Sequence, residues 1–223
     1  MGCAARLGIL VALATIALLV FGVNGVYEGV KYSHPTTMTF DEFVQRRPEA
    51  GWYRITGCQL AILDECHLFR EGQKDDLTTV SASYIPTFSS NEKLSFDTEQ
   101  KKSVSLLVFT KDAQVINAIH EIGARAGDKQ EMAKYLSENK NHLFLKRDVE
   151  GMLKAGLNSE DSDSKKAIDT AYSNRASDAA ILEEGKRPSL GTGIGLTVAG
   201  VVLAIGQVLY YLSGVGTRFS RRQ

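Results

Sequence analysis

The sequence has no surplus of charge of either sign, because 26 lysine and arginine residues balance 26 aspartate and glutamate residues. It therefore lacks the basic surface expected of a nucleic-acid-binding protein, and it lacks an acidic tail. Long apolar runs are also scarce. Only two are long enough to cross a bilayer, which excludes a transporter or channel built from many helices.

The charges that are present lie almost entirely in the middle of the chain. Only five charged residues fall outside residues 31–187, and that middle region carries 22 basic and 25 acidic side chains. A mildly acidic, water-compatible region therefore lies between two apolar ends. This distribution excludes a plain soluble enzyme and predicts a membrane protein.

The first apolar segment covers residues 7–27, which contain no charged side chain. As a helix it would reach about 31 Å, enough to span the hydrocarbon core of a bilayer. We expect a first transmembrane helix here, preceded by a short terminus of residues 1–6. A cleaved signal peptide is the alternative, with Arg6 as its charged start, but the run is longer than such peptides usually are.

The second apolar segment covers residues 188–213, and a basic tail follows at residues 214–223. Residues 28–187 then form a single domain between two spans. Arginines and lysines near the spans indicate orientation, since they prefer the cytoplasmic side. Four lie on the side of the termini (Arg6, Arg218, Arg221 and Arg222), and three lie on the other side (Lys31, Lys186 and Arg187). We expect a cell-membrane protein with both termini in the cytoplasm and the middle domain outside.

The second span carries small residues at steps of four, Gly191, Gly195 and Ala199, with Gly200 and Ala204 on a neighbouring stripe. Small residues at this spacing let helix backbones approach closely in a bilayer. We therefore predict that Gly191, Gly195 and Ala199 pack against another helix, in the same chain, in a second copy or in another membrane protein.

Each span also contains one strongly polar amide, Asn24 in the first and Gln207 in the second. With the expected topology they lie near opposite faces of the membrane, more than about 15 Å apart along the helix axis. They are not expected to pair within one copy.

The middle domain mixes strand and helix patterns. Thr39 and Glu42 fit a capping box before a short helix that Pro48 ends. Residues 52–62 are rich in aromatic and β-branched side chains and predict a long strand that Gly57 bends. Further strands are expected at 66–70, 78–88, 104–110, 143–149 and 180–183, and helices at 113–122, from 128 onward and at 164–177, the last after a polar linker. The fold class is therefore α+β with a mainly antiparallel sheet, for which a small barrel is one arrangement.

Four aromatic side chains are candidates for contact with the lipid headgroup layer, where amphipathic rings concentrate. Tyr210 and Tyr211 lie near the end of the second span, and Trp52 and Tyr53 begin the long strand. For Trp52 and Tyr53 the alternative is ordinary packing in the core of the domain.

Patterns that carry chemistry are incomplete in this sequence. His120 and Glu121 begin a zinc-protease motif, but Ala124 stands where the second histidine is needed. Cys66 and His67 are adjacent and would point to opposite faces of a strand. Asp161 and Asp163 resemble the start of a calcium loop that lacks its glycine. We expect no metal, no cofactor and no catalytic site. A disulfide between Cys58 and Cys66 is left open, since it needs a turn between them.

The sequence thus predicts a two-pass membrane protein whose middle domain acts by binding, as a scaffold or accessory component of the cell envelope. Its expected partners are the lipid bilayer and another membrane protein or a second copy, and not nucleic acid. A membrane-bound hydrolase with a dispersed active site and a cytosol-facing membrane adaptor are the alternatives.

Overall fold

The computed structural model describes residues 3–64, 66–69, 77–94, 103–154, 162–172 and 175–212. The chain divides into two compact units. One unit joins Met1–Ser33 to Pro188–Gln223, and the other is His34–Arg187.

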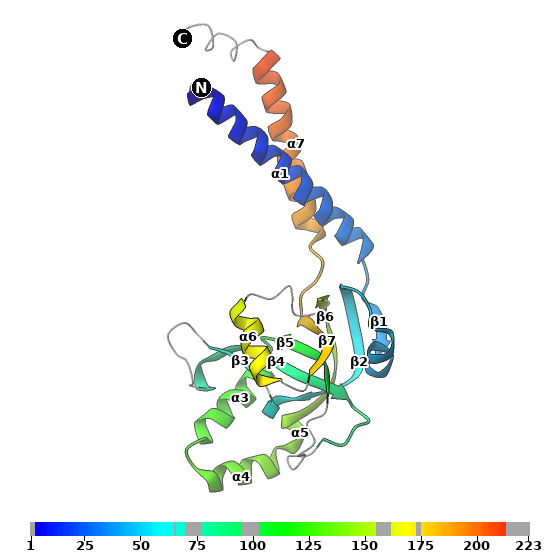
Figure 1. The fold of residues 1–223 in the computed structure, drawn as a ribbon, viewed down its shortest axis with the longest axis vertical. Helices are drawn as coiled ribbons and strands as arrows, with labels where there is room; N and C mark the ends of the chain where they lie inside the picture. The colour runs from blue at the N-terminus through cyan, green and yellow to red at the C-terminus, as the bar shows by residue number, and fades with distance from the viewer. Residues whose placement is uncertain are drawn as a thin grey trace. The chain divides into compact units, whose positions relative to one another are not determined.

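The first unit is a pair of long helices, α1 (Cys3–Lys31) and α7 (Leu190–Leu212). The stretches Gly8–Lys31 and Leu190–Tyr210 are long and apolar enough to cross a membrane, with mean hydropathies of 2.5 and 1.9. The two helices lie side by side and run antiparallel (Figure 1), since Gly29 meets Leu190 while Leu19 meets Gly200 further along the pair.

The second unit is the α+β domain that the sequence predicts. Its strands are β1 (Thr36–Thr39), β2 (Gly51–Ala61), β3 (Cys66–Phe69), β4 (Val80–Ser89), β5 (Val104–Thr110), β6 (Phe144–Lys154) and β7 (Arg175–Glu184). Its α-helices are α2 (Phe40–Arg46), α3 (Ala113–Arg125), α4 (Lys129–Glu138), α5 (Lys140–Leu143) and α6 (Ser162–Ala171), and short 3-10 turns lie at Ile62–Asp64 and Leu77–Thr79.

Five strands close into a barrel in the order β2-β6-β7-β5-β4, with β4 returning to β2. Every pairing around the barrel is antiparallel except that of β5 with β7. Strand β1 adds to β2 in parallel, and β3 adds to β4. This strand order has the topology of the five-stranded Greek-key barrels called OB folds. The small barrel that the strand pattern allows is therefore the arrangement found.

The bend predicted at Gly57 is present in β2. Gly57 has a φ of +69°, in the left-handed region that favours glycine. The register of β2 against β6 shifts between Ile55 and Cys58, which marks a bulge at this point. The bulge lets one long strand pair with both β6 and β4 and so helps the sheet to close.

Two apolar clusters hold the domain together. Alternate side chains of the strands fill the barrel interior together with α2 and α3, including Ile55, Leu106 and Ile119. The second cluster lies on the other face of β4, β5 and β7, where Ile168 and Tyr172, on α6 and just after it, cover the strands. The Tyr172 hydroxyl donates a hydrogen bond to the Tyr84 carbonyl, 2.8 Å away, which fixes α6 against β4.

The helix starts read from the sequence are confirmed. Thr39 and Glu42 form the expected capping box at α2. Asp112 accepts two backbone N–H groups at the start of α3, and Asp128 does so at α4. Each cap satisfies donors that the first turn of a helix leaves unpaired.

Two expectations for the end of the domain are wrong. The helix predicted at residues 164–177 begins two residues earlier, at Ser162, and ends at Ala171, so its first turn takes up part of the presumed linker. Residues from Arg175 belong to strand β7. The reason lies in the tertiary structure. Pairing of β7 with β5 and β6 satisfies the backbone hydrogen-bonding groups of this segment in the sheet, and this overrides the local helix propensity. The rest of the presumed linker, residues 158–161, lies outside the described residues.

Candidate functional site

The two apolar helices meet along one seam of α7. The seam residues of α7 are separated in turn by three, four, three and seven positions. They are Leu190, Gly193, Thr197, Gly200 and Gln207. This spacing follows one face of a helix that packs along another, as in a coiled coil. The facing seam of α1 contains Thr15, Leu19, Gly22, Gly25 and Gly29.

Glycine is required in the centre of this seam because the backbones touch. A Cβ atom added to Gly193 would lie 2.5 Å from the carbonyl carbon of Gly25. One added to Gly22 would lie 2.5 Å from the backbone nitrogen of Thr197. Close backbone approach of this kind holds helices together where lipid supplies no hydrophobic driving force between them.

The stripe of Gly191, Gly195 and Ala199 is not the one that packs within the chain. Nothing lies within 4 Å of a Cβ added to Gly191 or Gly195, and Ala199 is exposed. Gly195 lies about 160° around the helix from Gly193, so its stripe faces away from α1. Both stripes carry small residues at helical spacing, and only the tertiary contact distinguishes them. We call Gly191, Gly195 and Ala199 the outer stripe. Packing of this stripe against a second copy stays a prediction.

A polar contact closes the seam near the end of α7. Gln207 Nε2 donates a hydrogen bond to Thr15 Oγ1, 2.8 Å away, and that hydroxyl donates in turn to the Val11 carbonyl. Gln207 therefore pairs with a residue of α1 other than Asn24, which is exposed. Sequence reasoning missed Thr15 because a threonine inside an apolar span bonds its own helix as readily as a neighbouring one.

The aromatic candidates have different surroundings. Trp52 is half-buried, the Arg187 guanidinium lies 5.9 Å from its ring centroid, and its indole nitrogen has no hydrogen-bond partner among the described residues. Tyr53 packs against the barrel interior cluster. Tyr210 is exposed on α7, and the side chain of Tyr211 lies outside the described residues.

A group of polar side chains meets where β5, β6 and β7 approach the start of α3. Arg147 lies 2.8 Å from Glu184 and 3.6 Å from Asp112, and Thr110 donates to Glu184 at 2.6 Å. The two terminal nitrogens of Arg147 contact these carboxylates and tie the helix cap to the sheet, while its buried Nε atom has no hydrogen-bond partner among the described residues. Thr110 is 1% exposed, so a substrate cannot reach its hydroxyl. The arrangement is suited to holding the fold and not to nucleophilic catalysis.

The residues considered for metal binding do not converge in the part of the chain that the structure describes. His120 Nε2 lies 2.9 Å from the carbonyl oxygen of Val80, so its ring is used to fix α3 to β4. The side chains of Cys66, His67, Asp161 and Asp163 lie outside the described residues.

Cys58 is free and buried. Burial raises the pKa of its thiol to about 12, and the negative charges of Asp148 and Glu184 contribute to the same shift. A thiol with so high a pKa is protonated at neutral pH and is a poor nucleophile or metal ligand.

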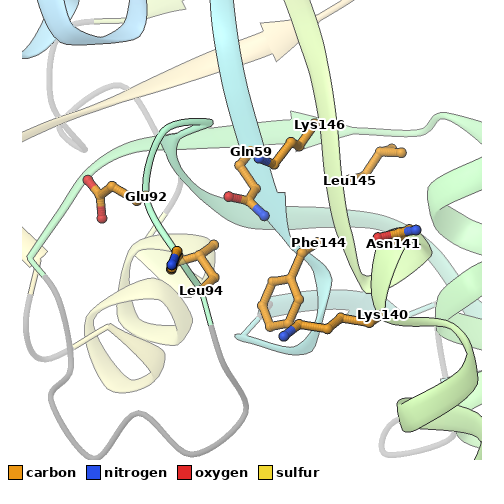
Figure 2. Close-up of a pocket in the computed structure, with 9 residues that line it drawn as sticks. Gln59, Glu92, Leu94, Lys140, Asn141, Phe144, Leu145 and Lys146 are labelled. Carbon is orange, nitrogen blue, oxygen red and sulfur yellow. The ribbon is translucent and has the colours of Figure 1, made fainter.

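One groove of the second unit brings together side chains that are distant in sequence (Figure 2). It encloses about 620 Å³ and is lined by Gln59, Glu92, Lys93, Leu94, Lys140, Asn141, Phe144, Leu145 and Lys146. These residues come from β2, β6, α5 and the turn after β4. No sequence motif predicts the groove, because three segments distant in sequence must meet before it exists.

Comparisons of the chain with protein families, with curated proteins and with solved structures found no match.

Proposed function

We propose that this chain is a two-pass membrane protein whose barrel domain acts by binding, as a scaffold or accessory component of a cell membrane. One observation carries the proposal. Within the described residues, every large apolar side chain that is exposed belongs to α1 or α7. A contiguous apolar surface of that extent is typical of a protein embedded in lipid and not of one exposed to water.

The contact between the helices supports retention of the first span. Removal of α1 as a signal peptide would expose Gly193, Gly200 and Gln207, which α1 now covers or bonds. An unpaired amide inside a bilayer is costly. The contacts between α1 and α7 therefore support the retention of α1 as a transmembrane helix.

The antiparallel pair also supports the proposed topology. If both helices cross the bilayer, Lys31 and Leu190 lie on one side, and the two chain ends lie together on the other. The basic residues near the chain ends then favour a cytoplasmic location for those ends and an outside location for the barrel.

Binding is the proposed mode of action because of how the polar groups are used. Arg147 and Thr110 both bond Glu184, and His120 is bonded to the backbone. The groove, by contrast, presents polar side chains to an open space. In OB barrels, nucleic acids bind over the second and third strands, which correspond here to β4 and β5. The α6 segment covers that face, which supports a partner other than nucleic acid.

Cysteine accessibility tests the topology. Cys3, Cys58 and Cys66 are replaced by serine or alanine, and a single cysteine is introduced at Asn91, which is exposed in the turn after β4. A matched variant carries its cysteine at Gln223. In spheroplasts of a bacterial host, an impermeant maleimide should label the Asn91→Cys variant and not the Gln223→Cys variant.

Detergent-permeabilised spheroplasts provide the control, because both variants should react there. The opposite labelling pattern would place the barrel in the cytosol and establish the adaptor alternative. Labelling of both positions in intact spheroplasts would overturn the two-pass topology.

A further inference from the structure

The floor of the groove contains a buried hydrogen-bond acceptor that has no donor. Gln59 is 5% exposed, and its Oε1 atom has no hydrogen-bond partner within the described part of the chain. Figure 2 shows its amide pointing into the groove between Phe144 and Lys146. Buried polar atoms are nearly always paired, and an unpaired one costs stability. The groove therefore offers a place for a donor that belongs to a ligand.

The rim of the groove is positively charged. Lys93, Lys140 and Lys146 line it against one carboxylate, that of Glu92. Lys146 Nζ donates one hydrogen bond to the Ser90 carbonyl at 2.7 Å, which holds the ammonium in place and leaves it two more donors. Lys140 of α5 and Lys146 of β6 thus line the same groove as Gln59 from two elements (Figure 2). This charge favours an anionic ligand.

We infer that this groove binds a phosphorylated polyol. The phosphate lies among the lysine ammonium groups, and a neighbouring hydroxyl of the ligand donates its hydrogen bond to Gln59 Oε1. A volume of about 620 Å³ lies in the range of pockets that hold small molecules. The same chemistry occurs in a free polyol phosphate and in the phosphoglycerol headgroup of a lipid. The inference rests on the proposal that the barrel acts by binding.

Calorimetry on the full-length protein in phosphatidylcholine nanodiscs tests the inference, with glycerol 1-phosphate as the probe. Methyl phosphate, which has no polyol hydroxyl, should bind about fivefold to tenfold more weakly, as expected for one lost hydrogen bond. Glycerol, which has no charge, should not bind.

Two variants separate the contributions of charge and hydrogen bond. Lys140→Gln should weaken the binding of both glycerol 1-phosphate and methyl phosphate. Lys134→Gln, on the exposed surface of α4, is the matched control and should change the affinity for neither probe. Gln59→Met removes the acceptor and keeps an apolar side chain of similar length. It should abolish the preference for glycerol 1-phosphate over methyl phosphate. Its thermal stability without ligand should not fall, because the unpaired acceptor is gone.

Phosphatidylglycerol nanodiscs distinguish the two sources. If the affinity for glycerol 1-phosphate is lower in these discs than in phosphatidylcholine discs, the lipid headgroup competes for the groove and is the ligand. If the affinity is the same in both discs, the ligand is a free polyol phosphate. The inference is overturned if glycerol 1-phosphate does not bind in either disc, or if its affinity and its preference over methyl phosphate survive Gln59→Met. Such a result would leave the labelling pattern of the Asn91→Cys and Gln223→Cys variants, and hence the proposed topology, unaffected.

Discussion

Gln207 of α7 donates a hydrogen bond to Thr15 of α1, although 192 positions of sequence separate them. Thr15 is buried in the seam between the two helices. The contact joins a side chain of the first helix to a side chain of the last, inside two stretches that are mainly apolar. It makes the two candidate spans a defined pair and not two independent anchors.

Replacement of Gln207 by leucine should weaken the helix pair. The expected loss is about 0.6 kcal/mol and at most about 1.7 kcal/mol, the mean and the maximum found for hydrogen bonds between membrane helices. The measurement is the free energy of unfolding of the full chain in mixed micelles as the denaturing detergent is increased. Asn24→Leu is the matched control, because Asn24 is exposed and lies away from the seam. Equal losses in the two variants would show that amide content matters and not the pairing with Thr15.

Alanine at Gly193 should destabilise the helix pair by about 1–3 kcal/mol, since its Cβ would overlap the α1 backbone. Alanine at Gly195 should leave the pair intact or stabilise α7 slightly, because that position is open and alanine is the better helix former. The same micelle unfolding assay measures both changes. Loss of stability at Gly195 and not at Gly193 would mean that the outer stripe forms the seam.

The outer stripe can be tested separately for contact between copies. Gly195→Leu should lower the fraction of dimer seen by chemical crosslinking in nanodiscs if that stripe packs against a second copy. Ile194→Phe is a suitable control, since Ile194 is exposed in the helix pair and lies about 100° around the helix from Gly195. An unchanged dimer fraction in Gly195→Leu would remove Gly191, Gly195 and Ala199 as an interface between copies.

The high pKa of Cys58 predicts a specific dependence of stability on pH. The folded thiol keeps its proton up to about pH 12, whereas an unfolded chain ionises it above about pH 9. The free energy of unfolding should therefore fall through this alkaline window, by at most about 1.4 kcal/mol per pH unit from this group, and show no such effect at lower pH. Urea unfolding followed by the fluorescence of the single tryptophan, Trp52, measures it. Cys58→Ala should show a shallower decline, and parallel curves would contradict the assignment.

Loss of the cap at Thr39 should destabilise the barrel domain. Thr39→Ala removes the side chain that accepts the Glu42 backbone N–H, at an expected cost of about 1 kcal/mol. Thr37→Ala, on an exposed position of the same short strand, is the matched control. Urea unfolding reported by Trp52 compares the two, and similar midpoints would show that the capping box adds little.

The sequence by itself determined the features that depend on neighbouring residues. Uninterrupted apolar runs define the two long helices, because length and hydropathy are local properties. Thr39, Asp112 and Asp128 mark helix starts, since a cap acts on donors two or three residues away. Gly57 marks the bend in β2 because its backbone conformation is accessible to glycine.

Tertiary structure decided everything that depends on which segments meet. Gly193 and Gly195 are equivalent in sequence pattern, and only the position of α1 makes the first a contact and the second a surface. Arg175 joins a strand because β5 lies beside it, which local propensity does not encode. Gln59 acquires neighbours from β6, from α5 and from the turn after β4 only when the barrel closes. Contacts between distant segments depend on the closure of the whole chain, and no local pattern in one sequence specifies them.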